Sequence, residues 1–185
     1  MNAYEALFIW LTGMSGSGKT TLSRAVEKML KDIDLKVLVI DGDDVRKKHK
    51  KKLGFSRDDV MENNLSIASR CIEHKNLFDI IIVSVISPYE DAREAVKKKL
   101  GSNFRLMYLK TDLEILKERD PKGLYSSADN GLITDLVGYS VSNPYEVPRK
   151  SDVSIDTGSG SSIEQSQEEM YQYIKDSFCS IKNQK

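Results

Sequence analysis

The chain has 185 residues and a formal net charge of zero, with 28 basic and 28 acidic side chains. This length suits one domain with a substantial core over residues 1–185, and the balanced charge gives no global reason to bind nucleic acid or a membrane. The first apolar run is too short for a signal peptide or a spanning helix, and Cys71 and Cys179 form no metal-binding spacing, so we expect a cytoplasmic protein with two small, buried thiols.

Residues 7–11 form a short apolar run that predicts a buried strand, and residues 20–31 carry the apolar stripe of a helix. The glycine-rich stretch between them fits G-x-x-x-x-G-K-[ST], a phosphate-binding P-loop in its proper context. Backbone N–H groups and the helix N-terminus then bind phosphate, Lys19 contacts the β- and γ-phosphates, and Thr20 offers a hydroxyl to Mg²⁺. The residues expected to hold the nucleotide are Gly13, Ser15, Gly16, Ser17, Gly18, Lys19, Thr20 and Thr21.

Residues 36–40 predict a second buried strand, which ends in an acidic cluster that contains Asp41, Asp43 and Asp44. Ligands of open parallel sheets bind at the carboxyl ends of the strands. Carboxylates there can bind Mg²⁺ or accept a proton from a hydroxyl nucleophile. The alternative is an ordinary turn, because Asp-Gly is a common turn pair, but the position beside a P-loop favours function.

A basic run follows over residues 46–52, with six Lys or Arg residues interrupted by His49. Because no aromatic residues alternate with these charges, we interpret the run as a solvated helix face and not as a nucleic-acid site. Arg46 is the exception, since it lies one turn beyond Asp43 and can face the site. Neither His49 nor His74 has a suggested partner, and we assign them no role.

The rest of the chain alternates between helical and β-branched segments. We expect a helix over 57–75 with Ser56 as its N-cap, a helix over 91–100, and strands over 80–86, 104–109 and 153–156. Capping boxes are expected at Thr111-x-x-Glu114, before a short helix to about residue 118, and at Ser161-x-x-Glu164, before the final helix. The predicted packing stripe of that last helix is Ile163, Met170, Tyr171, Ile174, Phe178 and Ile181.

The stretch over residues 119–150 breaks this alternation, because it is rich in Gly and Pro and has little helical period. A loop of this length in a compact domain is usually functional, and we expect a lid over the phosphates. Five strands alternating with helices predict an α/β protein with the P-loop NTPase fold, a parallel five-stranded sheet with helices on both faces and a lid.

The sequence also limits the kind of P-loop protein. The strand that ends at Ile86 has no acid at its end, where an ATPase would carry one, and no Asn-Lys-x-Asp guanine-reading motif occurs. Motor, ATPase and GTPase functions are therefore disfavoured. An acidic cluster after the second strand and a basic lid suit a small-molecule kinase.

Several segments resemble the adenylylsulfate kinases, in order, from about residue 8 to 157. They are residues 13–21, Ile40-Asp41-Gly42-Asp43-Asp44-Val45-Arg46, Leu53-Gly54-Phe55-Ser56, Glu62-Asn63, Ile86-Ser87-Pro88-Tyr89 and Arg119-Asp120-Pro121-Lys122-Gly123-Leu124-Tyr125. Members of this family act in sulfate assimilation and transfer the γ-phosphoryl group of MgATP to the ribose 3′-hydroxyl of adenosine 5′-phosphosulfate. The resemblance therefore implies ATP and Mg²⁺ as cofactors and a small nucleotide as the acceptor; homodimer formation is left open.

By position, the resemblance implies that Asp43 is the catalytic base and that Asp41, with Thr20, supports the metal. Arg46 and Asn63 would hold the anionic group of the acceptor, and Phe55 would stack on its base. The implied catalytic residues are Asp43, Lys19, Asp41, Ser87 (a phosphoserine in some members) and Lys122, and the implied acceptor-binding residues are Asp43, Arg46, Phe55, Asn63, Ile86, Ser87, Lys122 and Leu136.

The acceptor half departs from the family pattern. Where members usually have Asp-Arg-x-Glu-Asn-Ile-Arg-Arg, residues 59–66 read Asp-Val-Met-Glu-Asn-Asn-Leu-Ser, and Leu136-Val137-Gly138 replaces Phe-Thr-Gly. Adenosine 5′-phosphosulfate is the default acceptor. One alternative is an offshoot that phosphorylates another nucleotide, such as the cytidine diphosphoramidate used in bacterial surface-sugar decoration. A second is a P-loop switch without kinase activity.

Overall fold

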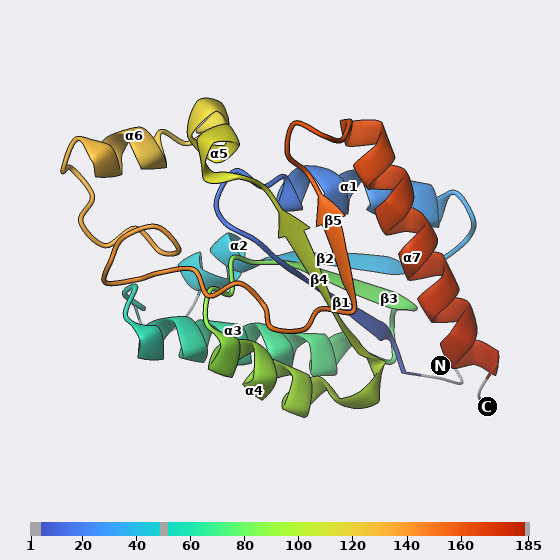
Figure 1. Ribbon diagram of the computed structural model, residues 1–185. Helices are drawn as coiled ribbons and strands as arrows, with labels where there is room; N and C mark the ends of the chain where they lie inside the picture. The colour runs from blue at the N-terminus through green and yellow to red at the C-terminus, as the bar shows by residue number, and fades with distance from the viewer. Residues whose placement is uncertain (1–4, 49–51, 184–185) are drawn as a thin grey trace.

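The structure, a computed structural model, describes residues 5–48 and 52–183, so His49 lies outside the described residues. Its centre is a parallel five-stranded sheet in the order β2-β3-β1-β4-β5 (Figure 1). The strands are β1 (Leu7–Thr12), β2 (Val37–Asp41), β3 (Ile80–Ser84), β4 (Phe104–Lys110) and β5 (Val153–Asp156). The predicted α/β fold is confirmed, and β1 lies in the middle of the sheet between β3 and β4.

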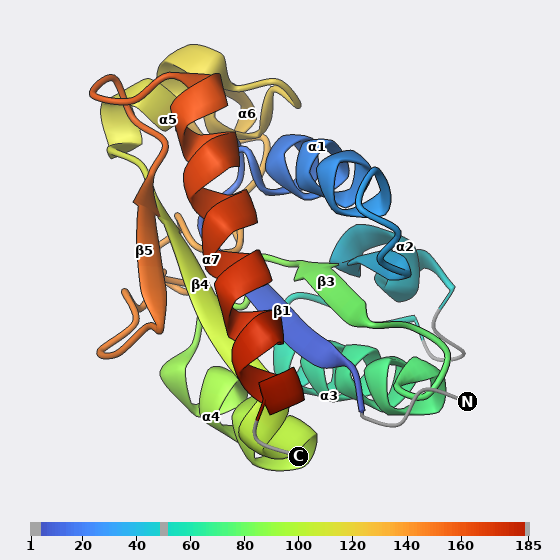
Figure 2. The same ribbon diagram turned by 90° about the vertical axis from the view of Figure 1, so that its right-hand side faces the viewer.

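Helices cover both faces of this sheet (Figure 2). One face packs against α1 and α7, and the other against α3 and α4. The helices are α1 (Lys19–Lys31), α2 (Gly42–Lys47), α3 (Arg57–His74), α4 (Glu90–Leu100), α5 (Leu113–Arg119), α6 (Leu124–Asp129) and α7 (Ile163–Asn183), with a 3₁₀ turn over Gly101–Asn103. Among the described residues, no helix is both long and apolar enough to cross a membrane.

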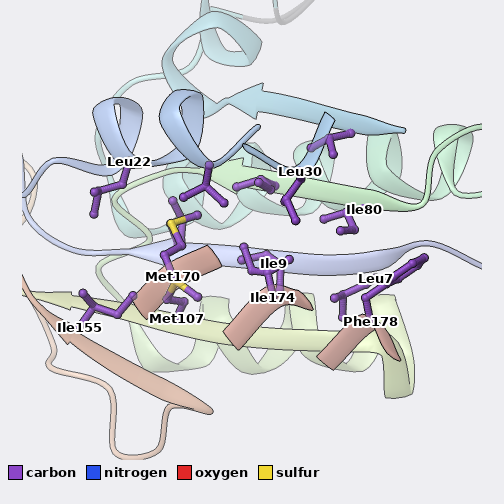
Figure 3. Packing of buried hydrophobic residues seen from close by; sticks show 14 of the residues in the cluster. Leu7, Ile9, Leu22, Leu30, Ile80, Met107, Ile155, Met170, Ile174 and Phe178 are labelled. Atoms are coloured by element: carbon purple, nitrogen blue, oxygen red, sulfur yellow. The ribbon is translucent and has the colours of Figure 1, made fainter. Parts of the chain in front are cut away.

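The core has two halves because side chains of a strand alternate between the faces of the sheet. In β1, Leu7, Ile9 and Leu11 pack toward α1 and α7, whereas Phe8 and Trp10 pack toward α3 and α4. Figure 3 shows the first half, in which Met170, Ile174 and Phe178 of α7 meet the β1 side chains. A strand that is buried on both sides holds the P-loop at its carboxyl end.

Two predicted capping boxes do not form as expected. The box before α7 pairs Ser162 with Gln165, one residue later than predicted, through reciprocal backbone contacts of 2.9 and 3.2 Å. Both Ser161 and Ser162 satisfy the motif, so the pattern alone could not choose the register. Thr111 does not cap α5, because its hydroxyl lies 2.6 Å from that of Thr157. The N-cap at Ser56 is confirmed by its bond with the Asp59 amide.

Three further expectations need correction. Residues 119–150 are not devoid of helix, since they contain α6. Cys179 is exposed, because it follows the buried Phe178 and points 100° away around α7; Cys71 is buried as expected. Ile163 is 58% exposed because α7 begins there, and the packing stripe starts with Met170.

Candidate active site

The P-loop lies between β1 and α1, where Gly18 adopts a left-handed conformation (φ 87°) at the N-cap of α1. Such a φ favours glycine, and it turns the loop into the helix. The Lys19 ammonium donates to the carbonyl oxygens of Gly13 and Met14, at 2.8 and 2.7 Å. A cavity of about 200 Å³ opens over the loop; it is lined by Ser15, Gly16, Gly18, Lys19, Thr20, Thr21, Asp41, Asp43, Ser84, Val85, Ile86, Pro121 and Lys122.

The Lys19 ammonium lies in an unusual electrostatic setting. Burial lowers its pKa to about 7; the carboxylates of Asp43 and Asp41 oppose this shift, and the charge of Lys122 adds to it. A buried ammonium with a lowered pKa gains most from a polyanion placed beside it. Phosphate oxygens bound in the cavity would therefore stabilise the charged form of Lys19.

The acids of β2 and α2 face the same cavity. The Asp41 carboxylate accepts hydrogen bonds from the Thr20 hydroxyl (3.1 Å) and the Asp43 amide (2.9 Å). The Asp43 carboxylate pairs with the Lys122 ammonium at 2.8 Å. Burial alone would raise the pKa of Asp43, but the hydrogen bond and charge of Lys122, helped by Lys19, bring it below its usual value. Thr20 and Asp41 therefore present a hydroxyl and a carboxylate oxygen side by side, a donor set that fits Mg²⁺.

A second, smaller cavity of about 60 Å³ adjoins the first. Asp43 and Ile86 line both cavities, as does Val85. The remaining lining residues of the second cavity are Gly42, Arg46, Phe55, Val60, Asn63, Asn64, Ser87, Pro88 and Val137. The structure thus brings the predicted acceptor residues together, with the exception of Lys122, which lines only the first cavity, and Leu136.

Leu136 does not line the second cavity. It is buried with Leu116 and Tyr125, against Met14 of the P-loop, and Val137 takes the place at the cavity. Either of two adjacent hydrophobic residues can face the cavity, and here the larger one, Leu136, packs against Met14 of the P-loop and Tyr125 of α6. The contact of Leu136 with an acceptor base stays a prediction, and it is Val137 that lines the second cavity.

The rim of the second cavity carries an aromatic ring and a cation. Phe55 is 48% exposed, and the Arg46 guanidinium lies 5.1 Å from its ring centroid. The same guanidinium donates to the Gly54 carbonyl. The pair places a flat apolar ring and a positive charge beside each other at the second cavity. The ring suits a nucleotide base, and the charge suits a phosphoryl group.

Ser87 forms the floor of the second cavity in a conformation that is rare for a residue with a side chain. Its φ is 46°, it is 1% exposed, and its hydroxyl lies 2.8 Å from the amide nitrogen of Asn64. The Ser87 carbonyl accepts from Thr12 (3.2 Å) and from the guanidinium of Arg93 (2.8 Å). These bonds hold the strained residue in place.

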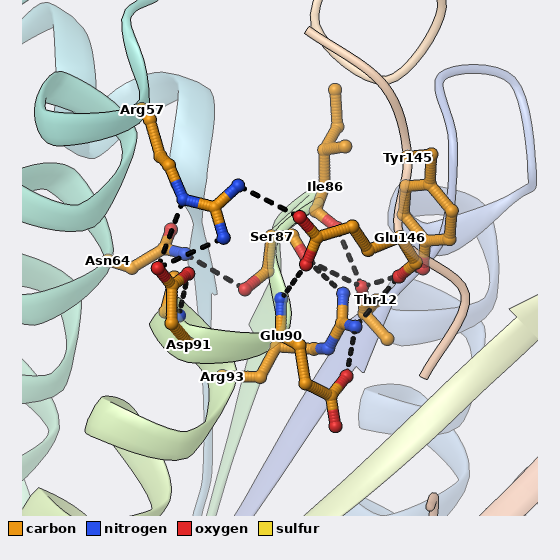
Figure 4. Close-up of polar contacts among 11 residues, drawn as sticks. Thr12, Arg57, Asn64, Ile86, Ser87, Glu90, Asp91, Arg93, Tyr145 and Glu146 are labelled. Atoms are coloured by element: carbon orange, nitrogen blue, oxygen red, sulfur yellow. Dashed lines mark hydrogen bonds and ion pairs between the residues drawn. The ribbon is translucent and has the colours of Figure 1, made fainter. Parts of the chain in front are cut away.

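Arg93 belongs to a wider network that joins three segments (Figure 4). It is 1% exposed, donates to the Glu146 carbonyl at 2.7 Å, and pairs with Glu90. The Glu146 carboxylate accepts from the Glu90 amide (2.7 Å) and pairs with Arg57 (2.8 Å). The end of the 119–150 stretch is thereby fastened to the start of α4 and to the Ser87 turn.

The beginning of the same stretch contacts the P-loop. The Tyr125 hydroxyl donates to the Ser15 carbonyl at 2.7 Å, and the Tyr125 ring packs edge-on against Tyr139. A third cavity, of about 310 Å³, lies between the P-loop and the start of α7, with Arg119, Pro121, Thr157 and Ile163 among its lining residues. The 119–150 stretch thus touches both the first and the third cavity.

Sequence reasoning missed Asn64, Val137 and Tyr125. For Asn64 a signal was available, because it falls on the stripe of Val60, Ile67 and Cys71, spaced by four, three and four residues, that faces the core from α3. A polar residue on such a stripe is a candidate for function. No local pattern distinguishes the roles of the other two residues.

Three features together define a P-loop kinase. They are a P-loop after the central strand β1, acids at the end of β2, which is the next strand along the chain, and a second cavity that shares one of these acids. The family model for adenylylsulphate kinase matches residues 5–156. The chain belongs to that family, and it is a phosphotransferase that acts on a hydroxyl acceptor.

Individual relatives agree with this assignment. The chain is 38% identical over 176 residues to an adenylyl-sulfate kinase of Bacillus pumilus, with 95% of this chain and 88% of the relative covered. It is 42% identical over 154 residues to a probable adenylyl-sulfate kinase of Pyrococcus abyssi, with 83% and 86% covered. The APS kinase of Mycobacterium tuberculosis in complex with AMPPNP and APS superposes with a TM-score of 0.83 at 30% identity, with 92% and 98% covered.

Proposed function

We propose that the protein transfers the γ-phosphoryl group of ATP to the ribose 3′-hydroxyl of adenosine 5′-phosphosulfate. One observation carries the proposal: the Asp43 carboxylate lines both the P-loop cavity and the second cavity. A hydroxyl bound in the second cavity beside Asp43 then faces a phosphoryl group bound beside Lys19. Because the relatives reported above are named adenylyl-sulfate kinases, we propose adenosine 5′-phosphosulfate as the acceptor.

Each side chain has a distinct role in this proposal. The P-loop amides and Lys19 hold the β- and γ-phosphates, and the Lys19 charge stabilises the transferred group. Asp43 accepts the proton of the acceptor hydroxyl, and Lys122 orients Asp43 through their 2.8 Å contact. Thr20 and Asp41 would hold Mg²⁺, which neutralises phosphate charge when bound.

The acceptor binds, in this proposal, against Arg46, Phe55 and Asn63, with Ile86 and Ser87 beneath it. Residues 119–150 act as a lid, because they touch the P-loop through Tyr125 and supply Lys122 to the site. Closing such a segment excludes water from the phosphoryl group. The third cavity is the place for the base of ATP, since it borders both the P-loop and Arg119.

The test is turnover by the purified protein with MgATP and a panel of acceptors. The panel contains adenosine 5′-phosphosulfate, cytidine diphosphoramidate and the common nucleoside diphosphates, and phosphorus NMR identifies the phosphorylated hydroxyl. We expect 3′-phosphorylation of adenosine 5′-phosphosulfate with the highest kcat/KM. A clear preference for another panel member would change the acceptor, and absence of transfer to every acceptor would support a switch without kinase activity.

A further inference from the structure

One polar side chain of the P-loop cavity has no role in the site described so far. Ser84 is the last residue of β3, is 4% exposed and lines that cavity. Its hydroxyl oxygen is buried and has no hydrogen-bond partner among the described residues. Buried hydroxyl groups are nearly always paired, so an unpaired one in the lining of a substrate cavity indicates that a bound group completes its hydrogen bonds.

The register of the sheet places this hydroxyl beside Asp41. Asp41 of β2 is the register partner of Ser84, and adjacent strands lie about 4.8 Å apart. Both side chains leave the same face of the sheet, because Val39 and Ile82, two positions earlier, both pack into the core half of α1 and α7. From this face the Thr20 hydroxyl reaches the Asp41 carboxylate at 3.1 Å. Ser84 therefore stands next to the two residues that fit Mg²⁺.

Two kinds of bound group can meet this hydroxyl, a phosphate oxygen of the nucleotide or a water of the metal. The P-loop already offers phosphate oxygens the Lys19 ammonium and its backbone amides. The neighbour of Ser84 is instead the Asp41 carboxylate, which repels phosphate and attracts a cation. Mg²⁺ keeps several of its waters when it binds to protein, and a hydroxyl oxygen accepts hydrogen bonds from such waters. The charges thus favour the metal's water.

The position of Ser84 in the fold supports the same role. P-loop NTPases hold Mg²⁺ with the P-loop hydroxyl and with an aspartate at the end of a further strand. No acid follows β3 in this chain, and Ser84 occupies its end. The carboxylate comes from Asp41, at the end of the adjacent β2. The two neighbouring strands therefore divide the task between a charged group and a neutral hydroxyl.

We propose that the Ser84 hydroxyl accepts a hydrogen bond from a water in the coordination shell of Mg²⁺ and so helps Thr20 and Asp41 to hold the metal. Ser84 is a positioning residue, because it acts through the metal and not on the reacting atoms. This inference rests on the proposed function, since it assumes that a metal–nucleotide complex binds in the P-loop cavity. Its distinctive consequence is that the hydroxyl strengthens nucleotide binding only when the metal is present.

The experiment measures the Kd of AMPPNP, an ATP analogue, by isothermal titration calorimetry with excess MgCl₂ and again with EDTA. The Kd in EDTA divided by the Kd in MgCl₂ is the metal effect. We expect Ser84→Ala to lower the metal effect by about three- to tenfold, the contribution of one hydrogen bond, and to leave the Kd in EDTA within about twofold. Ser84→Cys should show the same loss, because a thiol is a weak acceptor of similar size.

A matched control removes the same hydroxyl elsewhere. Ser69 is half-buried outside the P-loop cavity and donates to the Leu65 carbonyl within α3 at 2.9 Å, so the metal effect of Ser69→Ala should equal that of the wild type. Thermal unfolding without nucleotide tests the premise. Because Ser84→Ala removes an unpaired buried hydroxyl, its Tm should equal or exceed that of the wild type. A Tm lower by more than about 4 °C would show that the hydroxyl has a partner within the protein and would overturn the inference.

The outcomes separate this inference from the function on which it rests. A metal effect that is unchanged in Ser84→Ala, or retained in Ser84→Cys alone, would overturn the inference and leave the proposed function intact. Equal weakening in MgCl₂ and in EDTA would assign the hydroxyl to a phosphate oxygen and overturn the inference as well. Failure of the wild type to bind AMPPNP in either condition would overturn the proposed function and this inference together.

Discussion

Replacing Arg93 by Met should destabilise the protein far more than the same replacement at Arg24. Both arginines pair with a glutamate three residues away on their own helix. They differ in burial, since the side chain of Arg93 is 1% exposed and that of Arg24 is 55% exposed. The comparison therefore sets a buried arginine that also donates to two backbone carbonyls against an exposed arginine with a similar ion pair.

The expected magnitude follows from the contacts that are lost. Arg93→Met removes the guanidinium that donates to the Glu146 carbonyl at 2.7 Å and to the Ser87 carbonyl at 2.8 Å, and the Ser87 carbonyl keeps only its 3.2 Å contact with Thr12. An unpaired buried carbonyl costs about 1–3 kcal/mol, and breaking a buried charge pair costs about 3–5 kcal/mol. The removal of a buried guanidinium offsets part of this, because its Nε has no partner among the described residues. We expect a net loss of about 2–5 kcal/mol.

The assay is thermal unfolding followed by circular dichroism, with urea unfolding as a check on the free energy. For a protein of this size 1 kcal/mol corresponds to about 2–4 °C in Tm, so Arg93→Met should lower Tm by roughly 5–15 °C. The exposed pair of Arg24 is worth about 0.2–0.5 kcal/mol, which gives a change below about 2 °C. Equal Tm values for the two variants would refute the view that the buried network fastens the 119–150 stretch.

Four further predictions concern the proposed chemistry and the 119–150 stretch. Lys19→Ala should lower kcat by at least about a hundredfold with every acceptor, because it removes the charge on the transferred group, and near-normal kcat in the folded variant would contradict the kinase proposal. Asp43→Asn should lower kcat far more than it raises the KM for ATP; steady-state kinetics that show the reverse would make Asp43 a nucleotide-holding group. Since burial lowers the pKa of Lys19 to about 7, ATP binding at pH 8 should take up about one proton, measured by calorimetry in buffers of different ionisation enthalpy, and the same uptake in Lys19→Met would assign it elsewhere. Finally, hydrogen exchange over residues 119–150 should slow when nucleotide binds, whereas equal protection with and without nucleotide would argue against a lid.

Local patterns predicted the features whose causes are local. The strand, P-loop and helix around Lys19 follow from hydrophobic period and glycine spacing within about twenty-five residues. The acids of β2 were expected near the P-loop because parallel strands end at one edge. The structure places Asp41 within 3.1 Å of Thr20, across 21 residues of sequence.

Long-range packing determines the features that local sequence patterns could not predict. The contact of Arg93 with Glu146 spans 53 residues, and that of Tyr125 with Ser15 spans 110. Neither pair has a pattern that links its members along the chain. The choice between Leu136 and Val137 depends likewise on which side chain fills the space beside Met14, so a one-residue difference escaped motif comparison.

The two thiols differ enough to be useful in the laboratory. Burial raises the pKa of Cys71 to about 12, so that it stays protonated and unreactive toward maleimides, whereas Cys179 is exposed on α7. Cys179 follows Ile163, a lining residue of the third cavity, by sixteen positions, which is about 24 Å along the helix. The natural chain therefore carries one addressable attachment point for a dye or a surface linker, placed where it leaves the nucleotide end of the molecule unobstructed.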